Sequence, residues 1–236
     1  MMRLAGGLVF AALFAAAPAA AQSVEQLEQL EPGAGEVQAE YFGAWGGEGE
    51  QVFELQAGVS EQVALGVEAE FEGPGDGLVF EEFGFTALLR LADPEEVALA
   101  TGVMVEIGFD TDGELAELGG RFIAESIGER WWLQGNLIVR HQREDGERGT
   151  GLAYGVSAQR ALIDGLWFGA EASGQFARLS GPAELAPRGS HWIGPSLSGE
   201  IEPSEESEIE LGLAWMFRVS GEGQPSGPRV FLQASF

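Results

Sequence analysis

Apolar and polar side chains alternate along this chain with a period of two, from Glu36 to the last residue. In the stretch LGVEAEFE, Leu65, Val67 and Phe71 fall on one side, while Glu68 and Glu70 fall on the other. This alternation is typical of β-strands that have one apolar face, and it does not fit helical spacing. The pattern predicts twelve strands, at 36–45, 51–59, 62–72, 78–91, 96–109, 114–127, 130–143, 150–161, 165–178, 190–202, 207–219 and 228–236.

The connections between these segments are of hairpin size and contain Gly, Pro, Asp or Ser, so neighbouring strands should pair antiparallel. Alternate connections, such as SEQ, GE and IDG, are mostly tight. The others, such as GPGDG, REDGERG and SGPAELAPRG, are longer. One short-turn end and one longer-loop end are typical of up-and-down barrels of the bacterial outer membrane. An even strand number also lets the first strand, EVQAEYFGAW, pair with the last, RVFLQASF, which removes both sheet edges.

Two all-β architectures give this alternation: a water-soluble sandwich and a closed transmembrane barrel. Spanning strands need about 9–11 residues, whereas strands of globular sheets most often have about 5–6. Most of the predicted segments have at least nine residues. We therefore predict a closed antiparallel up-and-down transmembrane β-barrel of about 12 strands.

The apolar face carries no ionised group through the middle of the strands. Examples are the series Val97, Leu99, Thr101, Val103, Val105, Ile107 and Phe109, and the series Trp131, Leu133, Gly135, Leu137 and Val139. A charge at the bilayer midplane costs about 2–4 kcal/mol, so the absence of charged residues is expected of a face that contacts lipid. Aromatic residues near strand ends predict an interfacial girdle: Trp45, Trp131, Trp167, Trp192 and Phe236. Trp215 lies mid-strand and does not fit it.

The chain is strongly acidic. It has 38 acidic and 12 basic residues, and every basic residue is arginine. Nucleic acid is bound largely through basic contacts to phosphate, so we expect no nucleic-acid partner. There is no cysteine, which excludes disulfides and thiolate metal sites.

The first residues have the layout of a secretory signal peptide. Arg3 precedes an apolar run from Leu4 to Ala17, and small residues lead to a predicted cleavage point after Ala21. We expect residues 1–21 to be the signal peptide, 22–35 a short periplasmic lead-in, and 36–236 the barrel.

A signal peptide, serial amphipathic strands, Gly-rich turns and a final strand that ends in Phe236 together resemble Gram-negative outer-membrane β-barrel proteins. A looser likeness is to uncharacterised proteobacterial putative porins. The resemblance implies location in the outer membrane after removal of the signal peptide, among outer-membrane lipids and lipopolysaccharide. It also implies that Phe236, with Ala234 and Leu232 before it, resembles the signal that the barrel-assembly machinery reads.

Strand parity predicts which charged residues line the lumen. The expected acidic residues outnumber the expected arginines, and inward Trp132, Trp192, Phe80 and Met104 should narrow the bore. The predicted charged lining is Glu40, Glu54, Glu68, Glu70, Glu82, Glu106, Glu125, Glu171, Glu200, Glu210, Arg90, Arg121, Arg140, Arg218 and Arg229.

Two functions follow from this lining. If the bore is open, the excess carboxylates attract cations, and the protein is a narrow porin-like diffusion channel for small cationic or neutral solutes. If Glu–Arg pairs fill the interior, it is a closed structural or adhesive barrel. A one-residue slip in strand assignment would invert the lining.

An outer-membrane lipid hydrolase is a third class. Its His-x-Ser pattern would place both side chains on one strand face. His141 is followed two residues later by Arg143, and His191 by Ile193, so the pattern is absent. A serine from a neighbouring strand is the alternative partner, and we expect that the protein is not an enzyme.

We predict no cofactor or metal site. FDTDGE at 109–114 fails the EF-hand spacing and fits an Asp-Gly hairpin turn better. Arginines near the longer loops are candidates for lipid-phosphate contacts: Arg143, Arg148, Arg178 and Arg188.

Overall fold

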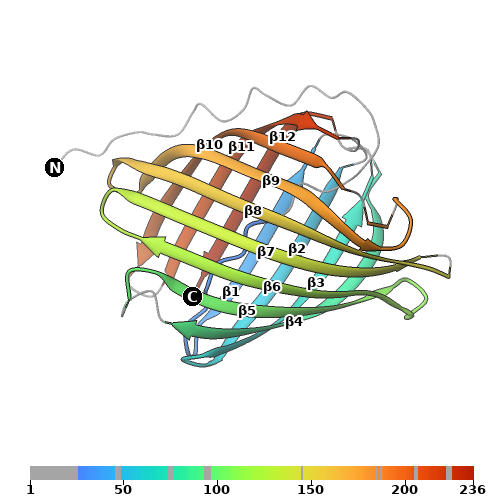
Figure 1. Ribbon diagram of the computed structural model, residues 1–236. Coiled ribbons are helices and arrows are strands. Elements are labelled where there is room, and N and C mark those ends of the chain that lie inside the picture. Colours follow the sequence, from blue (N-terminus) through green and yellow to red (C-terminus); the bar gives the residue numbers. More distant parts are fainter. Residues whose placement is uncertain are drawn as a thin grey trace.

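Twelve antiparallel strands form a closed barrel in the computed structural model (Figure 1). The structure describes residues 26–45, 49–73, 77–92, 97–144, 146–183, 185–186, 188–204, 207–221 and 225–236, so the expected signal peptide lies outside it. No helix in this part of the chain is long and apolar enough to cross a membrane. The strands are β1 (Val37–Ala44), β2 (Glu50–Ser60), β3 (Val63–Glu72), β4 (Val79–Ala92), β5 (Ala100–Asp110), β6 (Leu115–Ile127), β7 (Trp131–Glu144), β8 (Glu147–Ile163), β9 (Leu166–Ser180), β10 (Ser190–Ser204), β11 (Ser207–Ser220) and β12 (Gly227–Ser235).

The barrel is closed by the first and last strands. Each strand pairs with its neighbours in sequence, and β1 pairs with β12 from Gln38 opposite Ser235 to Ala44 opposite Arg229. Val37 and Phe236 exchange backbone hydrogen bonds of 2.9 and 3.0 Å next to this ladder. The predicted fold class, the antiparallel neighbours and the pairing of both ends are confirmed.

Strand boundaries differ most from the prediction at two places. β5 begins at Ala100 rather than 96, so Val97 and Leu99 lie in the bends before it. The predicted loop REDGERG is mostly strand, because β7 runs to Glu144 and β8 starts at Glu147. Gly146 turns the chain between them with a φ of 81°, a left-handed conformation that glycine adopts without steric cost.

The hairpin between β5 and β6 is held by one carboxylate. Asp110 Oδ1 accepts backbone hydrogen bonds from Asp112 (2.9 Å) and Glu114 (2.8 Å). Gly113 has a φ of 79° and donates to the Asp110 carbonyl. The Asp-Gly hairpin predicted for FDTDGE is confirmed, and Asp110 acts as its local hydrogen-bond acceptor.

Replacing Asp110 with Ala should lower the free energy of unfolding by about 1 kcal/mol, because two backbone donors lose their partner at an exposed turn. Urea unfolding of the barrel in lipid vesicles measures this effect. Asp112→Ala in the same turn is the matched control and should be nearly neutral. Equal losses in both variants would contradict the assigned role of Asp110.

The outer surface of the barrel is apolar. Large side chains that face outward from the strand centres are about half exposed, including Leu137 (52%) and Phe85 (51%). The sheet does not pack against a second sheet, because it closes on itself as one ring with its polar face inside. This excludes the sandwich and leaves the apolar surface for lipid.

An aromatic row crosses the outer faces of β1 to β4. Tyr41, Phe53, Phe71 and Phe80 form successive ring contacts with centroid distances of 4.9, 5.8 and 5.5 Å. Such rings are typical of the membrane interface of barrels. The predicted girdle missed this row.

The row also corrects the inward placement of Phe80. A β-bulge lies between the pairs Glu70–Glu82 and Phe71–Phe80, so one extra residue of β4 reverses the parity there. Phe80 therefore shares the outer face with Phe71 and is 38% exposed.

Trp192 is another correction. It was expected both in the girdle and in the lumen. Only 1% of its surface is exposed, and it packs among residues of the bore, so its predicted place in the girdle was wrong. Trp132 (6%) and Met104 (2%) are buried as inward residues. Trp167 packs against Trp132 with ring centroids 5.5 Å apart, whereas Trp131 and Phe236 are exposed on the outside.

Candidate functional site: the bore and its N-terminal lead-in

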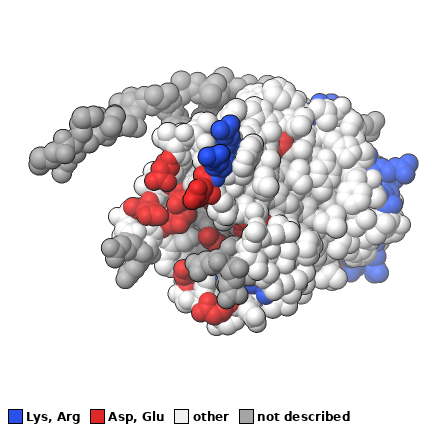
Figure 2. Space-filling view, turned by 60° about the vertical axis from the view of Figure 1, so that its left-hand side comes forward, with Lys and Arg blue, Asp and Glu red and all other residues white. Residues whose placement is uncertain are grey.

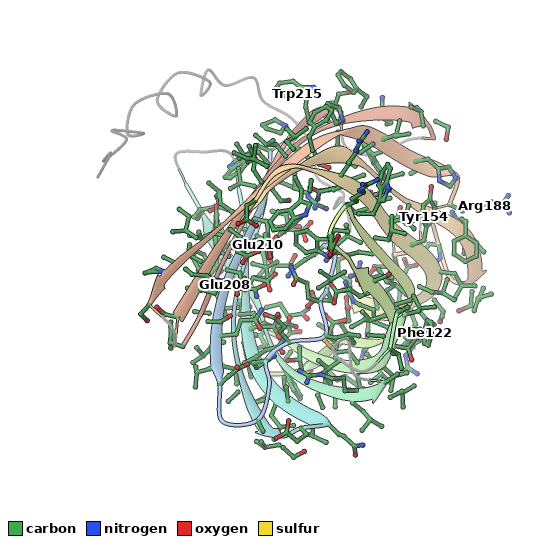
Figure 3. The ribbon with its side chains drawn as sticks, turned by 90° about the vertical axis from the view of Figure 1, so that its left-hand side faces the viewer. Phe122, Tyr154, Arg188, Glu208, Glu210 and Trp215 are labelled. Carbon is green, nitrogen blue, oxygen red and sulfur yellow. The ribbon has the colours of Figure 1, made fainter. Side chains whose placement is uncertain are left out.

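Most of the predicted lining residues lie in the bore. Figure 3 looks into it from the short-turn end, with Glu208 and Glu210 on the inner side of the wall and Phe122 and Trp215 on its outer side. Glu68, Glu70, Glu82, Glu200, Arg90 and Arg140 are half-buried, and Arg218 is exposed near the loop end. The deeply buried members are Glu40, Glu54, Glu106, Glu125, Glu171, Glu210, Arg121 and Arg229.

The prediction omitted charged residues of the wall, among them Glu208 and Glu117. The side chain of Glu117 on β6 accepts a 2.8 Å hydrogen bond from Arg140 Nε on β7. Glu117 has the same parity as Arg121 on the predicted strand, so the alternation contained the signal that would have found it.

Figure 2 shows acidic side chains gathered around the mouth at the short-turn end of the barrel. Glu200, Glu202 and Glu208 belong to this rim, at the end of β10 and the start of β11. A mouth lined by one sign of charge concentrates counter-ions, in this case cations.

The described part of the N-terminal lead-in, residues 26–35, runs through the bore. Nothing in the sequence indicated this path. Leu30 is fully buried in an apolar cluster with residues of β3 to β6, among them Leu88 and Ile123. The lead-in is therefore anchored to the wall by a hydrophobic contact near the short-turn end.

Polar contacts hold the backbone of the lead-in across the centre of the bore. The Glu28 N–H donates to Asn136 Oδ1 (2.7 Å), and Asn136 Nδ2 donates back to the Glu28 carbonyl (3.1 Å). Arg121 Nη1 donates to the Gln26 carbonyl (2.7 Å) and lies 3.7 Å from the Glu28 carboxylate. Asn136 thus pairs with the lead-in backbone as a neighbouring strand would.

Further side chains link the lead-in to other walls. Gln29 donates to Glu210 on β11 (3.0 Å), and Gln233 on β12 donates to Glu31 (2.9 Å). Arg90 on β4 donates to the Pro32 carbonyl (2.9 Å). These bonds reach walls that lie on different sides of the barrel, so the segment fills the bore rather than lining one side.

The Glu31 carboxyl belongs to the lead-in, outside the spanning strands. Burial raises its pKa to about 7, and repulsion from Glu208 and Glu125 acts in the same direction. Near neutral pH, Glu31 of the docked lead-in therefore keeps a proton that a free glutamate has already released. By linkage, the stabilisation of docking by the Glu31 proton is complete below the pKa of free glutamate and is lost as the pH rises through about 7.

The interior is also filled toward the loop end. A loop-end cluster, Phe42, Ala44, Trp192, Ala214 and Met216, packs inside the wall of β1, β10 and β11. The connection after β9 brings Leu185 and Ala186 into buried positions, and Arg178 Nε holds it by donating to the Ala186 carbonyl (2.6 Å). This bond makes Arg178 a loop anchor.

An ion pair crosses the bore between β12 and β9. Arg229 Nη2 bonds to Glu171 Oε2, and the guanidinium also lies 5.5 Å from the ring centre of Phe42. A cavity of about 20 Å³ remains beside this pair, and a second of about 20 Å³ lies beside Arg140 and Leu185. Each of these two cavities has room for about one water.

Both histidines lie near the loop end, and each contacts the hydroxyl group of a threonine or a tyrosine. His141 Nδ1 is 2.8 Å from Thr150 Oγ1, and His191 Nδ1 is 3.1 Å from the Tyr154 hydroxyl. Ser220 on β11 lies opposite His191 in the ladder, but its hydroxyl donates to the Gly189 carbonyl (2.9 Å).

The residues of the expected assembly signal lie on β12 and directly after it. Phe236 (60%) and Leu232 (41%) are exposed on the outer surface, and Ala234 is half-buried beside them. Their recognition by the assembly machinery stays a prediction.

The barrel resembles solved outer-membrane channels. The NanC porin matches with a TM-score of 0.55 and 8% identity over 85% of this chain and 98% of that one. An outer membrane channel from Pseudomonas putida F1 matches with a TM-score of 0.56 and 13% identity over 91% and 98%. The KdgM porin matches with a TM-score of 0.50 and 7% identity over 84% and 98%. No protein-family model and no curated protein sequence matches the chain. At these identities the likeness establishes the fold.

Proposed function

We propose that this protein is a narrow porin-like channel of the Gram-negative outer membrane, for small cationic or neutral solutes, with a bore that its lead-in closes. The exposed apolar belt and the likeness to outer-membrane channels support the location. The observation that carries the function is a closed barrel whose bore and short-turn mouth contain more carboxylates than guanidinium groups.

The charge of the lining supports the solute class. Acidic rings attract cations and repel anions. The KdgM porin has been solved in complex with oligogalacturonate, which is a polyanion. The carboxylates Glu68, Glu70 and Glu82 on the β3–β4 wall disfavour such a solute in this bore.

Single-channel recording tests the proposal. The mature chain, refolded and inserted into planar bilayers under a tenfold KCl gradient, should show openings whenever the lead-in leaves the bore. Their reversal potential should have the sign expected for K⁺ preference. Glu68→Gln/Glu82→Gln should reduce the K⁺ over Cl⁻ preference, because both carboxylates face the bore and neither belongs to a described ion pair. Glu202→Gln at the exposed rim is the control with a smaller effect. Anion preference would contradict the proposal.

A closed structural or adhesive barrel is the second candidate, favoured by the occupied bore. It is supported if neither the mature chain nor a chain without the lead-in conducts, while both remain folded and heat-modifiable in gels.

A further inference from the structure

The lead-in is an acidic segment that lies inside an acidic bore. From Gln22 to Leu89 the chain has no arginine, lysine or histidine, and the described lead-in carries Glu28 and Glu31. When both carboxylates are ionised, the negative charge of the lead-in opposes its docking among the carboxylates of the wall. Glu28 has a compensating cation, because its carboxylate lies 3.7 Å from Arg121 Nη1. The surroundings of Glu31 are different.

Carboxylates from several elements face Glu31. Its Oε2 accepts a hydrogen bond of 2.9 Å from Gln233 Nε2 on β12, which is a neutral donor. Figure 3 shows two of the facing carboxylates, Glu208 and Glu210, on the inner side of the wall. The facing acidic residues are Glu36 at the end of the lead-in, Glu125 on β6, and Glu208 and Glu210 on β11. An ionised Glu31 is therefore repelled from three sides.

The cation that attracts Glu31 is bonded elsewhere. Arg90 on β4 exerts this attraction, but its Nη2 donates to the Pro32 carbonyl (2.9 Å) and its Nη1 to the Glu61 carbonyl (3.3 Å). In the part of the chain that the structure describes, no arginine forms an ion pair with Glu31. A proton on the Glu31 carboxyl removes the repulsion that this guanidinium leaves uncompensated.

Protons can reach this carboxyl from solution. Glu31 is half-buried next to Leu30, near the short-turn mouth. Because its pKa is about 7 in the docked lead-in and near 4.5 in a free glutamate, the docking equilibrium constant should fall by up to about 300-fold from acidic to alkaline pH, the ratio of the two acid constants. Glu28 acts in the same direction, since burial raises its pKa against the attraction of Arg121.

The lead-in can leave the bore without opening the barrel. The ladders of β1 with β12 and with β2 contain no residue before Val37. Ala34, Gly35 and Glu36, which join the lead-in to β1, are exposed, and Gly35 has a φ of 84°. Release therefore breaks the side-chain contacts of the lead-in and leaves the strand pairs of the ring intact.

We propose that the lead-in is a pH-operated plug, which acidic solution holds in the bore and alkaline solution releases through ionisation of Glu31. The ring of strands is the same in both states, and only the occupant of the bore changes. The effect on conduction rests on the proposed channel function, whereas the movement of the lead-in does not.

Thiol labelling of the mature barrel in detergent micelles tests the movement. The chain has no cysteine, so Leu27→Cys introduces a single thiol at a position that is 7% exposed in the docked lead-in. Its rate of reaction with a water-soluble maleimide, divided by that of a free peptide thiol at the same pH, should rise at least tenfold from pH 5 to pH 8.5. Glu31→Gln in this background should remove most of the rise, because the amide has no proton to release.

Two further variants locate the effect. Glu208→Gln removes one of the carboxylates that repel Glu31, so the rise in thiol reactivity should be smaller. Glu202→Gln removes an exposed carboxylate of the same rim and is the matched control, which should keep the full rise. Mobility on unheated gels checks that each barrel is folded at both pH values.

Bilayer recording tests the consequence for conduction. The open fraction of the mature chain should rise severalfold from pH 5 to pH 8.5, and Glu31→Gln should stay mostly closed at both. Equal thiol reactivity at the two pH values in a folded barrel, or an equal rise with and without Glu31→Gln, would overturn the plug whether or not the barrel conducts. A thiol that becomes reactive at pH 8.5 in a barrel that never conducts would refute only the proposed function.

Discussion

A chain that begins at Gly35 is expected to conduct severalfold more current than the mature chain. Its bore lacks the lead-in segment that Leu30, Glu28 and Gln29 fasten to the walls. Two cavities beside the docked segment hold about one water each, so its removal frees space in the bore that these cavities do not provide. Single-channel recording of both chains at the same salt concentration measures the difference.

A point variant makes the same test without a deletion. A β-carbon added at Gly58 would lie 1.7 Å from the Gly33 carbonyl oxygen, so Gly58→Val should displace the lead-in and raise the conductance. Gly135→Ala is the matched control, because its β-carbon meets only Val156 at an ordinary 3.9 Å. If neither the shortened chain nor Gly58→Val conducts more than the mature chain, the loop-end cluster closes the bore, and the structural barrel is the better function.

Leu137→Arg should destabilise the membrane-inserted barrel by about 2–4 kcal/mol, the cost of a cation at the bilayer midplane of a transmembrane barrel. Leu137 lies at the middle of β7, faces outward and is 52% exposed, so the new guanidinium meets hydrocarbon. Reversible unfolding in lipid vesicles measures the loss. Leu137→Ala separates the charge from the loss of side-chain volume.

The same substitution nearer the membrane interface is the control for this prediction. Leu162 is 57% exposed at the short-turn end of β8, and Leu162→Arg should cost at most about 1 kcal/mol because the penalty falls toward the interface. Equal costs at Leu137 and Leu162 would show that the outer surface lies in water, which would contradict the membrane assignment.

Period-two alternation was sufficient to predict the architecture, because a closed barrel has one apolar and one polar face along every strand. The pairing of EVQAEYFGAW with RVFLQASF needed only an even strand number and hairpin connections. Alternation failed where the backbone inserts a residue. The bulge in β4 turned Phe80 outward, and its sign in the sequence is the doublet Glu81–Glu82, which breaks the alternation in LVFEEFGF.

The occupant of the bore was not predictable in the same way. Glu28 and Leu30 lie in EQLEQLEPGAGE, a short segment without strand alternation, and their partners are on β1 to β7. Contacts over such sequence distances are set by the closed ring and not by local periodicity. Parity identified the acidic wall, but it could not reveal that Glu40 and Glu54 would meet a third carboxylate from the lead-in.

The docking of the lead-in has a consequence for the order of folding. Its partners include Glu40 on β1, Asn136 on β7, Glu210 on β11 and Gln233 on β12. These surfaces face one another only after the last strand has joined the first. The lead-in is therefore the last segment to reach its native position, and the barrel remains hollow until its seam is complete.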